Sequence, residues 1–147
     1  MKRFTTGLLT VALCTFTLAM SGAAWAENPD DILVVTNKAS PLGELSLRVV
    51  QQIFLKKRGE VDGHGVSVFV ATSESPLRDA FAKAVLKMTP QQEAEYWANE
   101  LIQNGRSEPP STLTPLRAVS SLPSAISYVF RKNYKDGLAK IVATCPR

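Results

Sequence analysis

The chain has 147 residues, 17 of them Lys or Arg and 13 Asp or Glu, which gives a formal net charge of +4. This length allows one domain with a hydrophobic core of its own. A charge this small, spread without long blocks, gives no reason to expect a nucleic acid partner.

Residues 1–26 have the composition of a signal peptide. A basic pair precedes the apolar segment 4–20, and Ala24-Trp25-Ala26 supplies the small residues of a cleavage site. We therefore predict a cleaved signal peptide over 1–26, export to the periplasm, and a single domain over 27–147. Without the two basic residues of the leader, the formal charge becomes 15 − 13 = +2.

The two cysteines do not predict a disulfide. Cys14 falls within the predicted leader, so Cys145 is the one cysteine left in the exported domain. We expect Cys145 to be a packed small residue, with an intermolecular bridge as the minor alternative.

Apolar runs and helix starts alternate along the domain. Three helix starts pair a hydroxyl residue with proline (Ser75-Pro76, Thr89-Pro90 and Thr114-Pro115), and Thr89 with Gln92 predicts a capping box. Strands are expected at 31–36, 66–71, 125–130 and 138–142, and helices at 46–59, from 76, from 90 and at 115–122. This alternation predicts an α/β fold, a three-layer-like sandwich with a largely parallel or mixed sheet.

The helix from Pro90 has two predicted faces. Ala94, Trp97, Ala98 and Leu101 share one face at helical spacing, which we expect to be buried, whereas Glu93, Glu95 and Glu100 are expected in solvent. These carboxylates therefore carry no predicted role beyond solvation.

No motif in the chain indicates catalysis, a cofactor or a metal. The one histidine, His64, lies between two glycines and is expected to be a solvated turn residue. No Cys/His spacing fits a metal, and no nucleophile elbow, phosphate loop or dinucleotide fingerprint is present. We do not expect an enzyme.

Ser73, Ser75 and Arg78 have two interpretations. In the first, Ser75 caps a helix, Ser73 is a turn residue and Arg78 faces solvent. In the second, the hydroxyls, the first backbone N–H groups of the helix and the guanidinium converge on an oxyanion. Spacing alone favours the first interpretation.

Several segments resemble the periplasmic phosphate-type solute-binding proteins of ABC transporters. Ile53-Phe54-Leu55-Lys56-Lys57-Arg58-Gly59 is similar to an Ile-Phe-x-Gly-Lys stretch of that family, and Pro123-Ser124-Ala125-Ile126-Ser127-Tyr128-Val129 to its Pro-Gly-Ala-Ile-Gly-Tyr-Val stretch. Ser75 falls on the serine of the family's Ser-Gly-Thr phosphate-binding turn, and Phe81 on a later aromatic. The resemblance implies one lobe of a periplasmic binding protein, with phosphate or a similar anion as the ligand.

The chain also departs from that pattern. Pro76 and Leu77 replace the Gly and Thr of the binding turn, which removes a backbone donor and a hydroxyl. The exported domain has room for about one lobe, whereas the family closes two lobes around the anion.

Two hypotheses follow from this resemblance. The first is an exported solute-binding-like protein for uptake or sensing, working with a permease or sensor. Its anion would be held by Ser73, Ser75 and Arg78, with help from Ser40 and Lys38. The second is a ligand-free interaction module of the cell envelope, for which a homodimer is one possible form.

Overall fold

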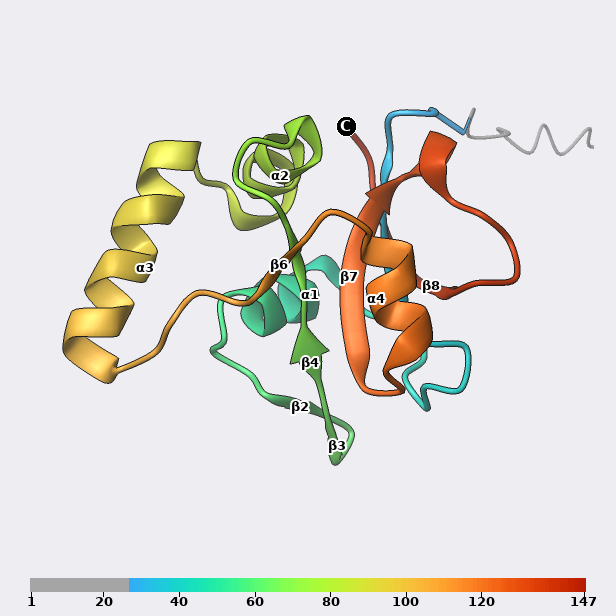
Figure 1. Ribbon diagram of the computed structural model, residues 1–147, viewed down its shortest axis with the longest axis horizontal. Helices are drawn as coiled ribbons and strands as arrows, with labels where there is room; N and C mark the ends of the chain where they lie inside the picture. The colour runs from blue at the N-terminus through green and yellow to red at the C-terminus, as the bar shows by residue number, and fades with distance from the viewer. Residues whose placement is uncertain (1–26) are drawn as a thin grey trace, which may run out of the picture.

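The computed structural model describes residues 27–147, and the predicted signal peptide lies outside the described residues. Its elements, drawn in Figure 1, follow in chain order: β1 (Ile32–Thr36), α1 (Leu47–Phe54), β2 (Glu60–Val61), β3 (His64–Gly65), β4 (Ser67–Val68), β5 (Val70–Ala71), α2 (Pro76–Phe81), the π-helical turn η1 (Ala82–Leu86), α3 (Pro90–Asn104), β6 (Ser111–Thr112), α4 (Pro115–Ser121), β7 (Ala125–Phe130), the 3-10 turn η2 (Arg131–Asn133) and β8 (Lys140–Cys145).

The main sheet is mixed, with strand order β4-β7-β1-β8. Strand β4 pairs with β7 in parallel, while β1 is antiparallel to both β7 and β8. Every residue of β1 is buried, as expected for a strand covered on both faces. Leu33 and Val35 pack with Val119 of α4, whereas Ile32 and Val34 lie in the core on the side of α1, α2 and η1. The predicted three-layer α/β arrangement is confirmed.

One interrupted strand joins this sheet to a second pair of strands. Ser67 and Val68 of β4 pair with β7, and two residues later β5 pairs in parallel with β6. The change of partner falls at Phe69, whose N–H still donates to the Ile126 carbonyl at 2.9 Å. Strands β4, β5, β6 and β7 therefore run in one direction. We call the side of the fold where they end, at residues 72–75, 113–114 and 131–133, the carboxyl edge.

The helix starts follow the predicted capping chemistry at two of three positions. Ser75 accepts from the Leu77 N–H at 3.3 Å, and Thr89 and Gln92 form the complete capping box. Thr114 makes no side-chain cap bond, so that prediction is wrong. Ser46 caps α1, where its hydroxyl accepts from the Val49 N–H.

Several predicted boundaries and faces are corrected. Helix α1 ends at Phe54 rather than at Gly59, because Lys56 has a positive φ of 52°. Strand β8 begins at Lys140 and runs to Cys145, further along the chain than predicted. The predicted turn is present at residues 62–63 and His64 is exposed as expected, but short strands β2 and β3 flank this turn and form a hairpin, with His64 in β3.

Helix α3 buries a different face from the predicted one. Trp97 is buried as expected, but Ala94, Ala98 and Leu101 are exposed, and the second buried residue of the helix is Glu93. Cys145 is a free, buried thiol, which confirms its prediction as a packed residue. Burial raises the pKa of this thiol to about 11.

Candidate functional site

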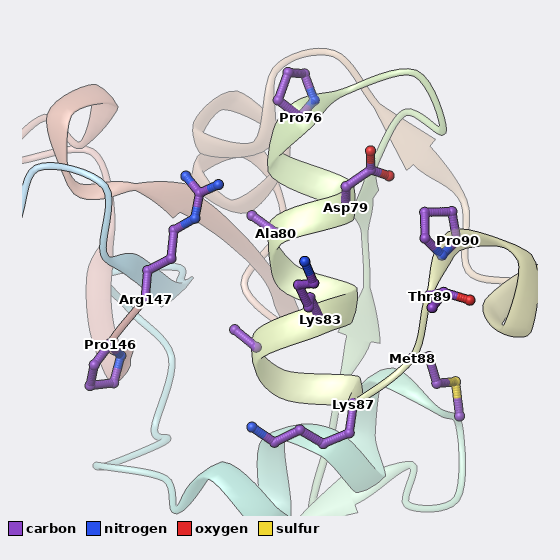
Figure 2. Close-up of a pocket in the computed structure, with 11 residues that line it drawn as sticks. Pro76, Asp79, Ala80, Lys83, Lys87, Met88, Thr89, Pro90, Pro146 and Arg147 are labelled. Carbon is purple, nitrogen blue, oxygen red and sulfur yellow. The ribbon is translucent and has the colours of Figure 1, made fainter.

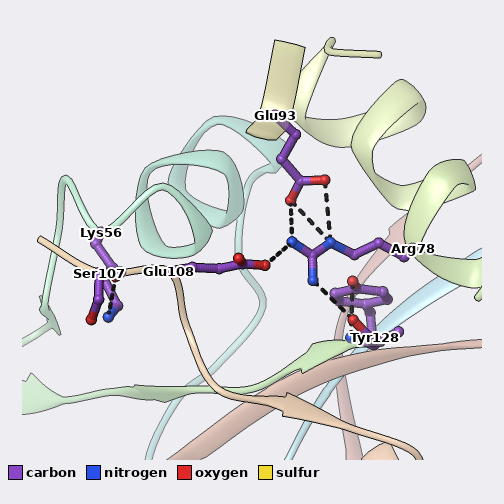
Figure 3. Close-up of polar contacts among 7 residues, drawn as sticks. Lys56, Arg78, Glu93, Ser107, Glu108 and Tyr128 are labelled. Atoms are coloured by element: carbon purple, nitrogen blue, oxygen red, sulfur yellow. Dashed lines mark hydrogen bonds and ion pairs between the residues drawn. The ribbon is translucent and has the colours of Figure 1, made fainter. Parts of the chain in front are cut away.

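Arg78 lies at the centre of a buried polar network (Figure 3). Its Nε donates to Glu93 Oε1 and Oε2 at 3.0 and 3.2 Å, and its Nη2 donates to Glu93 Oε1 at 2.8 Å. Nη1 donates to the Ala71 carbonyl at 2.9 Å, and Nη2 also pairs with Glu108. The guanidinium thus joins α2 to β5, α3 and the segment before β6. The expectation of a solvent-facing Arg78 is wrong.

The network keeps Arg78 charged despite its burial. Desolvation disfavours the guanidinium cation, but the hydrogen bonds that it donates to Glu93 and Glu108 outweigh this effect, so the pKa of Arg78 lies above its ordinary value. Tyr128 lies beside this network, and its hydroxyl accepts from the Ala71 N–H at 3.1 Å. Burial of the Tyr128 hydroxyl raises the pKa of this side chain above its ordinary value.

Ser73 and Ser75 line two different hollows. Ser73 and Arg78 line a small hollow of about 120 Å³, whose other lining residues include the carboxylates Asp79, Glu93 and Glu108. Three carboxylates around one guanidinium make this hollow unfavourable for an anion. Ser75 lines a hollow of about 720 Å³ at the carboxyl edge, which we call the edge cavity.

The edge cavity has the electrostatics of an anion site. Its lining includes the cations Arg117, Lys132 and Lys135 and contains no Asp or Glu. Lys132 pairs with Asp30 at 2.7 Å, whereas Arg117 and Lys135 have no ion-pair partner within residues 27–147. The Ser75 hydroxyl accepts the Leu77 N–H and keeps its own proton free to donate. Ligands of open α/β sheets bind outside the carboxyl ends of strands, which is where this cavity lies.

Lys38 and Ser40 lie at the opposite edge of the sheet. Both follow β1, which runs antiparallel to β7, so they lie beside the start of β7 while Ser75 lies beside its end. The length of β7 separates the two edges by about 17 Å. Ser40 is buried and its hydroxyl accepts from the Leu42 N–H at 3.3 Å. The structure therefore does not bring Lys38 and Ser40 to one small anion with Ser75.

A third hollow, of about 590 Å³, lies on another side of α2 (Figure 2). Lys83, Lys87 and Arg147 line it together with Asp79, and it contains none of the five predicted ligand residues. Within the described part of the chain, no cluster of three or more His, Cys, Asp or Glu has metal-binding geometry. No helix between residues 27 and 147 is long and apolar enough to span a bilayer.

Two solved structures share this fold. A protein from Clostridium perfringens, described as a phosphate ABC transporter substrate-binding protein and solved with bound phosphate, aligns with a TM-score of 0.56 and 23% identity over 77% of this chain. An ABC-type phosphate transport receptor from Vibrio cholerae aligns with a TM-score of 0.58 and 13% identity, also over 77%. No protein-family model and no curated protein matches the sequence.

The fold is that of a periplasmic-binding-protein lobe, as the sequence resemblance implied. The chain spans only 44% and 45% of the two solved chains, so it corresponds to less than half of each. At these identities the likeness establishes the fold, and the ligand has to be argued from the residues of this chain.

Sequence reasoning placed Ser75 at the start of a helix, as the structure has it, but missed the charged partners of Arg78 and the cations near Ser75. Glu93 and Glu108 lie 15 and 30 positions from Arg78, and neither spacing indicates a partner. Arg117 is distant in sequence from Lys132 and Lys135, and the three line one cavity because α4 begins at the edge where β7 ends. A search for cations near the predicted strand ends would have been the one available signal.

Proposed function

We propose that the protein is an exported solute-binding-type lobe that binds phosphate or a similar oxyanion for uptake or sensing. The binding site is the edge cavity, where the anion contacts the Ser75 hydroxyl at the start of α2. The observation that carries the proposal is the lining itself, which has three cations and no carboxylate at the carboxyl ends of parallel strands. Catalysis has no part in this function, and a membrane permease or a sensor is the downstream partner.

In this proposal the anion's charge is balanced by residues other than Arg78. Lys135 and Arg117 supply unpaired positive charge, and Ser75 donates a hydrogen bond. Arg78 serves instead as the structural cation that holds α3 and the Glu108 segment against α2. Ser73 lies on the acidic side of the same turn and is a weaker candidate for the anion.

A second candidate function is a ligand-free interaction module of the cell envelope. One observation favours it: the Arg78 guanidinium, which the sequence placed in the anion site, already donates to Glu93, Glu108 and the Ala71 carbonyl. In this case the lobe would act through a protein partner or as a homodimer, without an anion.

Thermal unfolding with and without phosphate tests the proposal, with sulfate as the comparison anion. A ligand that binds only the folded state stabilises it by RT ln(1 + [L]/Kd), which is about 1.4 kcal/mol at a tenfold excess over Kd. We expect phosphate to raise the unfolding midpoint. The absence of any shift with either anion, together with self-association or a co-purifying partner, would favour the interaction module.

The chain supplies a matched control for Ser75. Ser46 caps α1 through a bond of the same length, 3.3 Å to the Val49 N–H, and does not line the edge cavity. Ser75→Ala and Ser46→Ala should each lose about 1 kcal/mol of stability through the missing cap. Only Ser75→Ala should lose the phosphate response, and equal responses in the two variants would contradict the proposed site.

A further inference from the structure

The edge cavity is much larger than inorganic phosphate requires. Its volume is about 720 Å³. A bare tetrahedral oxyanion takes roughly the space of three water molecules, or about 100 Å³. Pockets of 300 to 1,000 Å³ are typical of sites that enclose organic ligands. Most of this cavity would remain filled with water around phosphate alone.

Apart from the three cations, most of the cavity lining is apolar. They come from all the segments that meet at the carboxyl edge: Leu77, Leu113, Leu116, Val129, Phe130 and Leu138. Leu113 is 85% exposed and Leu138 is 45% exposed, so two large apolar side chains of the cavity lining are accessible to solvent. Covering them with an apolar ligand group would be favourable, because it removes apolar surface from water.

Cations and apolar groups line the same cavity. Lys132 lies 5.1 Å above the Phe130 ring, and Lys135 and Leu138 come from one short segment. A ligand that reaches Lys135 or Arg117 with a negative head group therefore places any substituent next to these apolar side chains. The lining has no carboxylate that would repel such a ligand.

We infer that the edge cavity selects an organic phosphate or phosphonate, an oxyanion that carries an aliphatic or aromatic substituent, over inorganic phosphate. The inference rests on the proposed anion site at Ser75 and deepens it. The oxyanion contacts Ser75 and the unpaired cations, and the substituent covers Leu113 and Leu138. Size and lining set this preference, since both ligands offer the same head group to the cations.

Calorimetric titration of the purified protein with phosphate, phenyl phosphate and phenol tests the inference, at about pH 8, where a phosphate ester carries close to two charges. We expect phenyl phosphate to bind roughly tenfold or more tightly than phosphate, from partial burial of the ring. Phenol, which lacks the oxyanion, should bind much more weakly than phenyl phosphate. Lys135→Gln should weaken both anions.

Exposed leucines provide variants that should fold normally. The double variant Leu113→Asn/Leu138→Asn should lose most of the preference for phenyl phosphate and keep phosphate binding. Ile102→Asn is the matched control, since Ile102 is 81% exposed on α3 and lies outside the cavity. It should bind both anions like the unaltered protein.

The outcomes separate the inference from the function on which it rests. Equal affinity for phosphate and phenyl phosphate, or an unchanged preference in the leucine double variant, would overturn the inference and leave the anion site standing. Phenol binding as tightly as phenyl phosphate would also overturn it. If neither anion binds, both the inference and the proposed function fail.

Discussion

Arg78→Met should be the most destabilising single change in the polar network. The side chains of Arg78 and Glu93 are 7% and 8% exposed, so removing the guanidinium leaves a buried carboxylate without its cation. Breaking a buried pair from one side costs about 3–5 kcal/mol. That is a large fraction of a typical total stability of about 5–15 kcal/mol. At an m-value near 2 kcal/mol/M, the urea midpoint should fall by roughly 2 M.

Two further variants show whether burial of the charge is the cause. Glu108→Gln should cost less than about 1 kcal/mol, because the Glu108 side chain is 46% exposed and water can solvate the groups left behind. Arg78→Met/Glu93→Leu should recover much of the loss, since it removes both buried charges. A loss below 1 kcal/mol for Arg78→Met, or no recovery in the double variant, would refute the reasoning.

Three other predictions concern single groups. Tyr128→Phe removes the acceptor of the buried Ala71 N–H and should cost about 1–3 kcal/mol in chemical unfolding. Gly63→Ala should cost about 1 kcal/mol because Gly63 has a φ of +80°, whereas Gly59→Ala, at an open position with ordinary φ, should cost less, as thermal midpoints will show. Burial raises the pKa of Cys145 from 9.0 to about 11, so the unfolded chain loses this thiol proton first. The stability it contributes is complete below about pH 9 and declines between pH 9 and 11, a decline that should be shallower in Cys145→Ala.

Strand positions and helix caps could be predicted from the sequence where they depend on one short segment. The apolar runs of β1 and β7 and the caps at Ser75 and Thr89 depend on neighbouring residues, and the structure has them where expected. The lobe-like fold was also predictable, because the alternation of strands and helices and the resembling segments agree.

The candidate site could be predicted only in part, because strand direction decides which residues lie at the same edge of the sheet. The alternating pattern says nothing about whether β1 runs with or against β7, and the antiparallel pairing places Lys38 and Ser40 at the other edge. The role of Arg78 was hidden for a similar reason. Glu93 looked like one of several surface carboxylates, and only the packing of α3 brings it to the guanidinium.

The position of β1 also constrains how the chain reaches its native state. Ile32 near the start of the domain pairs with Phe130 on one side and with Cys145 on the other. Strand β1 therefore has no partner in the main sheet until residues 126–130 have left the ribosome, and no second partner until residues 140–145 have followed. Until then the apolar side chains of residues 32–35 remain uncovered, and sheets built from such distant pairings close slowly. A shortened chain that ends before β8 should be trapped in an unfolded or aggregating form.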